Sequence, residues 1–217
     1  GSRPVLSSGG KEMVVDTGPD FRKHMLRARV GSIEGVIITH EHNDHTAGLD
    51  DLRPFCFKQE MDIPVYCLPR VAAGLRERFA YAFTNYPGVP RLDIREVNFG
   101  DTVAFAGHEI ELVEVSHGTL PIIGLCTRDL AYLTDVKHLP ARTLVQCKDK
   151  KAVVISALKH VGTHSHLSLG EALDYPAVLN AERGILTHFS HRMGRMADIN
   201  STLPPGIELG FDGLKIT

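Results

Sequence analysis

A dense run of possible metal ligands occupies positions 40 to 45, in the order His-Glu-His-Asn-Asp-His. Imidazole nitrogens and carboxylate oxygens are ligands that zinc, manganese and iron accept in proteins. His40 and His42 can face one ion, while Asp44 and His45 can turn toward a second. The run follows the apolar stretch Val36-Ile37-Ile38, which is typical of a buried strand. We therefore predict that this run contributes to a site for two metal ions.

Three more residues of metal-binding type occur later in the chain, each just after an apolar run. His117 follows an alternating stretch, Asp135 follows residues 131–134, and His188 follows residues 184–187. A strand end is a stiff position from which several side chains can be aimed at one point. A polar turn that is rich in histidine by chance would not account for this recurrence. The predicted ligands are His40, His42, Asp44, His45, His117, Asp135 and His188.

The elements that must position these ligands alternate between short β-branched runs and longer amphipathic stretches. Helices are predicted at residues 19–29, 69–79 and 168–179, and residues 81–92, which hold two prolines and a glycine, are predicted to form a loop. Strands interleaved with helices in both halves indicate a layered α/β domain with two sheets covered by helices. The predicted strands lie at residues 13–15, 35–38, 64–67, 109–115, 122–125, 130–133, 152–156 and 184–187.

Composition narrows the class of protein. The 217 residues are 43% hydrophobic, which suits one domain with a sizeable core. A formal net charge of −2 argues against a nucleic-acid partner, and no apolar run is long enough to cross a bilayer. The four cysteines are scattered without a C-x-x-C pair, so we expect buried free thiols and a reducing, cytoplasmic setting.

Together these residues resemble the metallo-β-lactamase-fold hydrolases, from Asp16 to Asp212. The resemblance implies one domain over residues 1–217, built as an αβ/βα four-layer sandwich of two mixed sheets flanked by helices. It also implies that Asp16, in the run Asp16-Thr17-Gly18, supports the ligands from behind. By the same resemblance, His40, His42 and His117 would hold one metal, Asp44, His45 and His188 the other, and Asp135 would bridge them.

A second motif points to a branch of this family. Residues 164–172, His-Ser-His-Leu-Ser-Leu-Gly-Glu-Ala, are similar to a histidine motif of the phosphodiesterase branch. That branch includes tRNA 3′-processing enzymes and the PhnP-type cyclic phosphodiesterases. Residues 16–22, 132–135 and 186–191 resemble the PhnP type closely. The resemblance implies that His166 protonates the leaving group or holds the phosphate. His164 would either line the pocket beside it or bond to the backbone.

The resemblance sets the expected reaction. We expect a phosphodiesterase for small cyclic phosphate or nucleotide-like diesters, in which a hydroxide shared by two divalent ions attacks phosphorus. Asp135 and His166 would be its catalytic residues, and zinc, manganese or iron its metals. The expected partner is a small-molecule phosphodiester, and a homodimer stays open. The alternatives are an RNA-processing nuclease of the tRNase Z type, a lactonase-type hydrolase, and a metal-binding scaffold without activity.

The sequence also departs from the family pattern. Members usually begin with a strand and a glycine-rich loop with several cysteines, which hold a structural zinc in the PhnP type together with a histidine that matches His191. We expect that segment to be absent here, so His191 would be a remnant ligand or an ordinary surface histidine. The aromatic residues Tyr81, Phe83 and Tyr86 could stack on a sugar or base, or simply pack on the surface.

Overall fold

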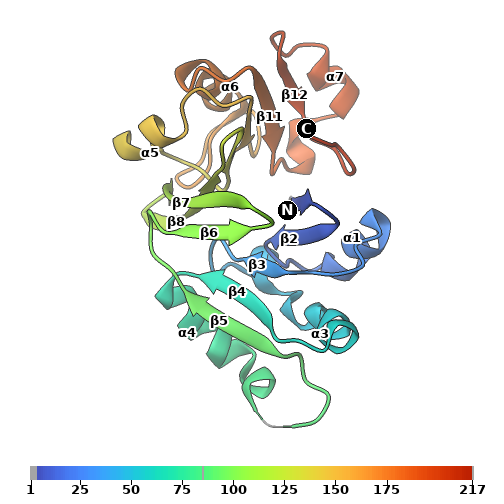
Figure 1. Cartoon of the computed structure of the whole chain (residues 1–217). Coiled ribbons are helices and arrows are strands. Elements are labelled where there is room, and N and C mark those ends of the chain that lie inside the picture. The colour runs from blue at the N-terminus through green and yellow to red at the C-terminus, as the bar shows by residue number, and fades with distance from the viewer. Residues whose placement is uncertain (1–3, 85, 217) are drawn as a thin grey trace. The chain divides into compact units, whose positions relative to one another are not determined.

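A computed structural model describes residues 4–84 and 86–216 of the chain (Figure 1). The chain divides after His108 into two compact units, each with its own sheet residues and helices. The sequence predicted a single domain over residues 1–217, and that organisation stays a prediction. The predicted α/β class, with two mixed sheets flanked by helices, is confirmed.

The first unit holds a five-stranded sheet in the order β1-β2-β3-β4-β5. The first two strands pair antiparallel, whereas β2 through β5 are parallel to their neighbours. Val15 lies opposite Ile37, so the segments that follow β2 and β3 leave the sheet at the same edge. The strands are β1 (Val5–Ser8), β2 (Lys11–Val15), β3 (Gly35–Ile37), β4 (Ile63–Cys67) and β5 (Leu92–Glu96).

The helices of the first unit follow the predicted pattern in part. α4 (Pro69–Arg78) begins with proline, which is tolerated at a first helical position, and buries Val71, Ala72 and Leu75 on one face. The helix α3 (Arg53–Gln59) was not predicted, because Cys56 is its one buried residue and no apolar period marks it. The others are α1 (Phe21–Ala28), α2 (Asn43–Thr46), η1 (Leu49–Leu52) and η2 (Ala80–Phe83).

Gly48 sits where the chain after α2 passes close to the segment before α1. A Cβ atom at this position would lie 2.3 Å from the carbonyl oxygen of Gly18 and 2.7 Å from Cβ of Phe21. We expect Gly48→Ala to lower the free energy of unfolding by about 3 kcal/mol, because backbone must move to make room. Gly74→Ala, in open space on α4, is the control and should raise it by about 0.5–1 kcal/mol. Urea unfolding measures both, and equal stability of the two variants would contradict the packing argument.

The second sheet has seven strands in the order β12-β11-β10-β9-β8-β7-β6. The run from β9 to β12 is parallel, whereas β7, β8 and β9 pair antiparallel. Valine, isoleucine and leucine side chains from β7, β9, β10 and β11 form its buried core. The strands are β6 (Thr102–Phe105), β7 (His108–His117), β8 (Leu120–Cys126), β9 (Leu130–Leu133), β10 (Ala152–Ser156), β11 (Arg183–Thr187) and β12 (Ile207–Leu209).

Helix α6 (Leu169–Val178) begins with a capping box directly after the predicted catalytic segment. The Ser168 hydroxyl accepts from the backbone N–H of Glu171, and the Glu171 carboxylate accepts from the backbone N–H of Ser168 at 2.7 Å. These bonds to Ser168 and the ammonium of Lys137 lower the pKa of Glu171 to about 2. The cap therefore anchors the chain that carries His166. The other helices are α5 (Ala141–Gln146), η3 (His191–Met193) and α7 (Met196–Asn200).

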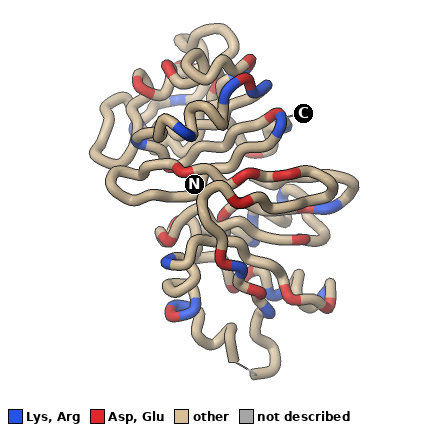
Figure 2. The backbone as a smooth tube through the Cα atoms, turned by 60° about the vertical axis from the view of Figure 1, so that its left-hand side comes forward, with Lys and Arg blue, Asp and Glu red and all other residues tan. Residues whose placement is uncertain are grey.

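Surface and thiol features agree with the composition. Basic and acidic residues are interspersed along the backbone of each unit, so neither unit carries charges mainly of one sign (Figure 2). All four cysteines are free and buried, as expected. Among the described residues, no helix combines the length and apolar character that crossing a bilayer requires.

Candidate metal centre

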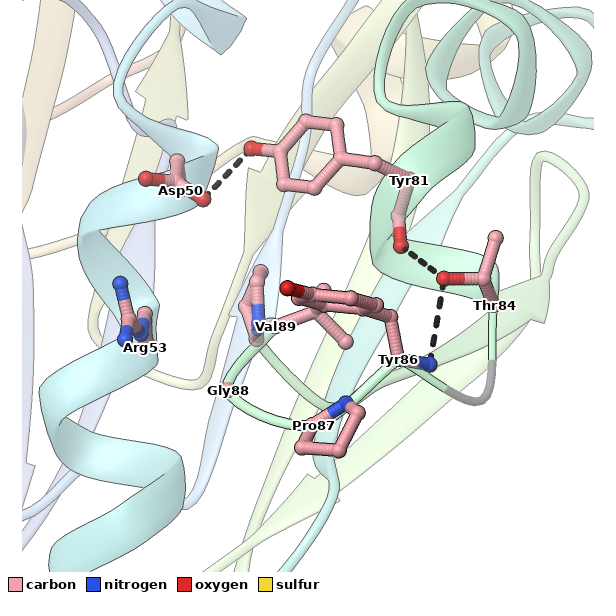
Figure 3. Close-up of a pocket in the computed structure, with 9 residues that line it drawn as sticks. Asp50, Arg53, Tyr81, Thr84, Tyr86, Pro87, Gly88 and Val89 are labelled. Atoms are coloured by element: carbon pink, nitrogen blue, oxygen red, sulfur yellow. Dashed lines mark hydrogen bonds between the residues drawn. The ribbon is translucent and has the colours of Figure 1, made fainter.

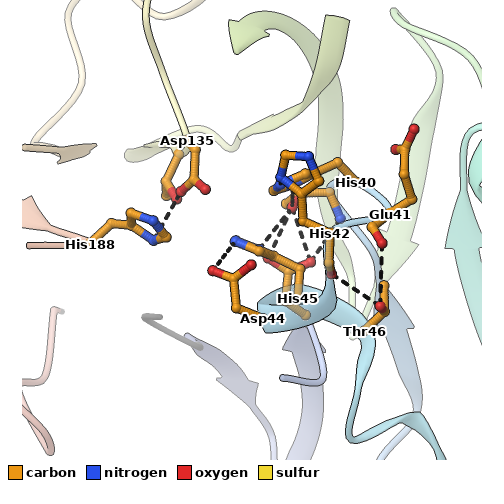
Figure 4. A network of polar contacts seen from close by, with 11 residues as sticks. His40, Glu41, His42, Asp44, His45, Thr46, Asp135 and His188 are labelled. Carbon is orange, nitrogen blue, oxygen red and sulfur yellow. Dashed lines mark hydrogen bonds and ion pairs between the residues drawn. The ribbon is translucent and has the colours of Figure 1, made fainter. Parts of the chain in front are cut away.

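The run from His40 to His45 leaves the carboxyl end of β3 and forms the single-turn helix α2 (Figure 4). His40 is fully buried, whereas His42 and Asp44 reach solvent. Nε2 of His40 lies 2.9 Å from Nδ1 of His42. Two imidazole nitrogens that converge on one point suit a shared ion, so the local geometry fits the predicted ligand role.

Asp16 lies behind this run, immediately after β2. Its Oδ1 accepts from the backbone N–H of Thr39 at 2.8 Å, and its Oδ2 lies 2.7 Å from Nδ1 of His45. Because the carboxylate is an acceptor, Nδ1 of His45 carries the proton and Nε2 is left for a metal. Asp16 also has a φ of 63°, a left-handed conformation that is costly for a residue with a side chain. This is the supporting position that the resemblance implied for Asp16.

In the second unit, the parallel strands β9, β10 and β11 bring Asp135 and His188 to one edge of the sheet. Leu133 pairs with Ile155, and Ser156 pairs with Thr187, so the segments after β9 and β11 emerge together. Oδ1 of Asp135 lies 3.0 Å from Nδ1 of His188 and accepts from the hydroxyl of Thr134 at 2.8 Å. The peptide bond before Asp135 is cis, and His188 has a φ of 53°.

His117 and His166 lie at the same edge. Nδ1 of His117, the last residue of β7, donates to the carbonyl oxygen of Ser165 at 2.8 Å, which leaves its Nε2 for a metal. The ring of His166 lies 4.6 Å from that of His117 and 5.3 Å from that of His188, measured between centroids. One ligand atom each from His117, Asp135 and His166 lies within 4.8 Å of the other two. His166 is therefore placed to serve either as the predicted acid or as a ligand.

The donor sets of both units fit a divalent ion. Imidazole nitrogens and carboxylate oxygens are the ligands that zinc, manganese and iron share, and the contacts of His45 and His117 fix their tautomers. Each unit by itself gathers the predicted residues that it contains. The first unit supplies His40, His42, Asp44 and His45, and the second supplies His117, Asp135 and His188.

Two predicted residues lie apart from these groups. His164 is exposed and sits in a bend over residues 164–166, not in the extended segment that would have placed it on the same face as His166. His191 is exposed at the start of η3. Neither belongs to a group of possible metal ligands among the described residues, and their roles stay predictions.

The segment predicted as a loop at residues 81–92 begins with the turn of η2, ends in β5 and lines a cavity of about 630 Å³ (Figure 3). Tyr81 donates to the carboxylate of Asp50, and burial together with that contact raises the pKa of Tyr81 to about 12. Tyr86 is 73% exposed, and Arg53 lies on the opposite wall. Stacking of these rings on a sugar or base stays a prediction.

Sequence reasoning did not single out two arginines of α4 that contact the ligand run. Arg70 donates to the carboxylate of Glu41 at 3.1 Å, and Arg78 donates to Asn43 and, at 2.9 Å, to Thr46. Their separation of eight positions puts both on one helix face, a signal that the sequence contains. Nothing in the sequence, however, indicates which segment that face would meet.

Comparison with known proteins places this geometry in a family. Residues 11–189 match the profile described as the Beta-lactamase superfamily domain. The chain therefore belongs to the beta-lactamase superfamily, and its fold is that of the metallo-β-lactamase-fold hydrolases.

Individual relatives narrow the position within that family. A solved diphosphatase of the PhnP family superposes with a TM-score of 0.91 at 30% identity, covering 98% of this chain and 81% of that one, so the predicted closeness to the PhnP type is confirmed. The short form of human tRNase Z, at 17% identity and a TM-score of 0.72 over 87% of this chain and 85% of its own, shares the fold. An octanoyltransferase of Porphyromonas gingivalis is 34% identical over 214 residues, which are 97% of this chain but 43% of that protein. The chain thus spans less than half of that relative's length.

Proposed function

We propose that this chain is a two-metal-dependent phosphodiesterase for small cyclic phosphate or nucleotide-like diesters. The observation that carries the proposal is the position of His166, whose ring lies beside His117 and His188 in the second unit. A histidine in this position can supply the proton that the alkoxide leaving group of a phosphodiester requires. The similar PhnP-family structure supports the same branch.

The ligands would be shared between two ions. The resemblance assigns His40, His42 and His117 to one ion, Asp44, His45 and His188 to the other, and Asp135 to both. When bound, two divalent ions offset the charge on a phosphoryl group and make hydroxide available near neutral pH. Asp16 and the carbonyl of Ser165 would hold His45 and His117 in the tautomers that ligands need.

His166 would move the proton that the reaction requires. Its backbone N–H donates to the hydroxyl of Thr163 at 3.0 Å, and Ser168, two residues later, caps helix α6. The backbone of His166 is therefore held on both sides. An anchored imidazole can protonate an alkoxide leaving oxygen without a search for the correct geometry. Asp135 would bind both ions, and therefore contributes to every step that depends on them.

A second candidate is hydrolysis of a diphosphate. The solved structure at 30% identity is a diphosphatase. Hydrolysis of the phosphoric anhydride bond of a diphosphate, like hydrolysis of a phosphodiester, is attack of water on phosphorus. The leaving group then is a phosphate oxygen, which departs with less need of a proton than an alkoxide. Diphosphate substrates should therefore depend less on His166 than cyclic diesters do.

The name of the octanoyltransferase relative suggests acyl transfer instead. Because the match covers 43% of that protein, its activity is not assigned to the shared part. Acyl chemistry, lactone hydrolysis and RNA processing are accordingly separate arms of the functional test, and absence of all activity is the outcome expected for a scaffold.

The test compares substrate classes on metal-loaded protein. We expect turnover of a ribose cyclic phosphate to exceed that of a matched phosphomonoester by about 100-fold, or about 2.7 kcal/mol in barrier. A diester carries one negative charge, which two divalent ions can offset. A monoester carries nearly two, so it would bind tightly to the ions and dissociate slowly, which lowers its turnover. Nucleoside diphosphates, a lactone, an octanoyl thioester and a tRNA precursor complete the panel. Efficient cleavage of any of the last three with no activity on small phosphodiesters or diphosphates would overturn the proposal.

Metal content is expected to reach about two ions per chain, because the resemblance assigns the seven predicted ligands to two sites. Elemental analysis of protein purified without chelators measures it, and removal by a chelator should abolish activity until zinc or manganese is restored. Less than about half an ion per chain after reconstitution would contradict the two-metal proposal.

A further inference from the structure

We propose that Arg78 of α4 is a positioning residue for Asp44, a predicted metal ligand on α2. Arg78 would not touch the ion. It would act through Asn43 and Thr46, the first and last residues of α2, between which Asp44 lies. The catalytic meaning of this inference rests on the proposed function, whereas its geometry lies within the first unit alone.

The helix α2 needs support from outside itself. It is a single turn of four residues, Asn43–Thr46, and isolated turns are unfavourable because many dihedral angles are fixed for few hydrogen bonds. Its N-cap is His42, whose side chain makes no capping hydrogen bond. The side chain of His42 instead has its Nδ1 directed toward Nε2 of His40, where the predicted metal would bind. The position of α2 therefore depends on contacts from outside the turn, among them the backbone N–H of Thr17, which donates to the carbonyl oxygen of His45 at 2.7 Å, and the side chain of Arg78.

The guanidinium of Arg78 supplies that support at both ends of the turn. Its Nη2 donates to Oδ1 of Asn43, and its Nη1 donates to Oγ1 of Thr46 at 2.9 Å. Thr46 in turn donates to the carbonyl oxygen of His42 at 3.0 Å. The planar fork of an arginine fixes the separation of its two acceptors. One side chain thus sets the ends of α2 and the direction of the backbone between them.

Other ligands of the first unit have separate support. Asp16 holds Nδ1 of His45, and the hydroxyl of Thr39 lies 3.0 Å from Nδ1 of His40. Asp44 is exposed on α2, and its Oδ2 lies 3.3 Å from Nε2 of His45 in the same turn, so its position depends on the backbone of α2. Loss of Arg78 should therefore weaken the ion that Asp44 serves more than the ion that His40 serves.

The same helix offers a matched control. Arg76 donates to the carboxylate of Glu96 in β5 at 2.7 Å, in an ion pair that is also partly exposed. Arg76→Ala removes the same type of side chain from the same helix without touching the ligand run. Arg78→Lys keeps the charge but replaces the fork with a single ammonium, which should recover part of the effect.

Hydrogen exchange on metal-free protein tests the geometry. In Arg78→Ala we expect the amides of residues 42–48 to exchange about tenfold faster than in the wild type, with no such change in Arg76→Ala. Arg78→Lys should fall between them. Zinc titration against a chromogenic chelator tests the consequence. One of the two binding steps should lose about tenfold in affinity in Arg78→Ala, and the other step should change little.

Two results would overturn the proposal. One is exchange of residues 42–48 in Arg78→Ala that equals the exchange in Arg76→Ala. The other is an equal loss at both zinc steps, which would show general loosening instead of positioning of one ligand. If the wild type itself bound fewer than two ions, the proposed function would fail, while the exchange comparison would still decide the role of Arg78.

Discussion

Replacing Asp135 with alanine is expected to lower kcat/KM for phosphodiesters by at least about 10³-fold, which is about 4 kcal/mol in transition-state stabilisation. Asp135 carries the carboxylate that the resemblance assigns to both ions. It is buried and lies 3.0 Å from the ring of His188, so no neighbouring water-exposed group can replace it. Steady-state kinetics with metal content measured on the same samples checks the result.

The matched control is Asp129→Ala, which removes an exposed aspartate from the turn just before β9 and should leave activity unchanged. Asp135→Asn keeps the side-chain volume and can still accept from Thr134, so it separates lost charge from lost packing. Removal of the Asp135 carboxylate leaves the hydroxyl of Thr134 without its acceptor and should lower the free energy of unfolding by about 1–3 kcal/mol. Circular dichroism and thermal unfolding measure this change. Near-normal turnover of Asp135→Ala with both ions bound would show that Asp135 is not the bridge.

Replacing His166 with alanine is expected to act selectively. An alkoxide leaving group needs a proton, whereas a nitrophenolate departs well without one. General acid assistance is typically worth about 10²–10⁴-fold. In His166→Ala we therefore expect kcat/KM for a ribose cyclic phosphate to fall by about 10²–10⁴-fold. For a nitrophenyl diester it should fall by less than about tenfold, and the metal content should not change. The measured quantity is the ratio of kcat/KM losses on the two substrates.

His138→Ala serves as the control, because this histidine also lies in the second unit but is exposed and is not a predicted site residue. His42→Ala provides the opposite pattern, with equal loss on both substrates and lower metal occupancy. Equal loss on both substrates in His166→Ala, with metals retained, would rule out proton donation and leave a phosphate contact. Loss of metal in that variant would make His166 a ligand, which its distance to His117 and Asp135 also allows.

Residue types and local pattern determined much of this protein before any coordinates. Short apolar runs predicted β2, β3, β9, β10 and β11, since runs of this length bounded by polar segments favour buried strands. Residues of metal-binding type follow those runs directly, so they lie at the carboxyl ends of the strands. Because neighbouring parallel strands have their carboxyl ends at the same edge of the sheet, these residues come close together. That is why Asp16 contacts His45, and Asp135 contacts His188, in the structure, whereas the roles of these residues stay predictions.

Short elements with weak periodicity were not predictable in this way. The turn of α2, the helix α3 and the edge strand β1 bury few residues or are too brief to show a period. Their conformations come from contacts with segments distant in sequence, and local propensity has little influence on them. The bend that leaves His164 exposed belongs to the same class, because the alternation expected for an extended segment does not hold there.

The sequence by itself determined the class of fold, the chemical types of the ligands and the strand ends that carry them, because these depend on periodicity and on residue chemistry. Only the tertiary structure decided which side chains stand behind the ligands. The bond from His117 to Ser165 joins residues 48 positions apart, and the fork of Arg78 reaches back 32 and 35 positions to Thr46 and Asn43. Such contacts are set by how strands and helices pack, and the spacing of the arginines along α4 does not indicate which segment each of them meets. Packing therefore distinguishes Arg78, on the ligand run, from Arg76, on β5.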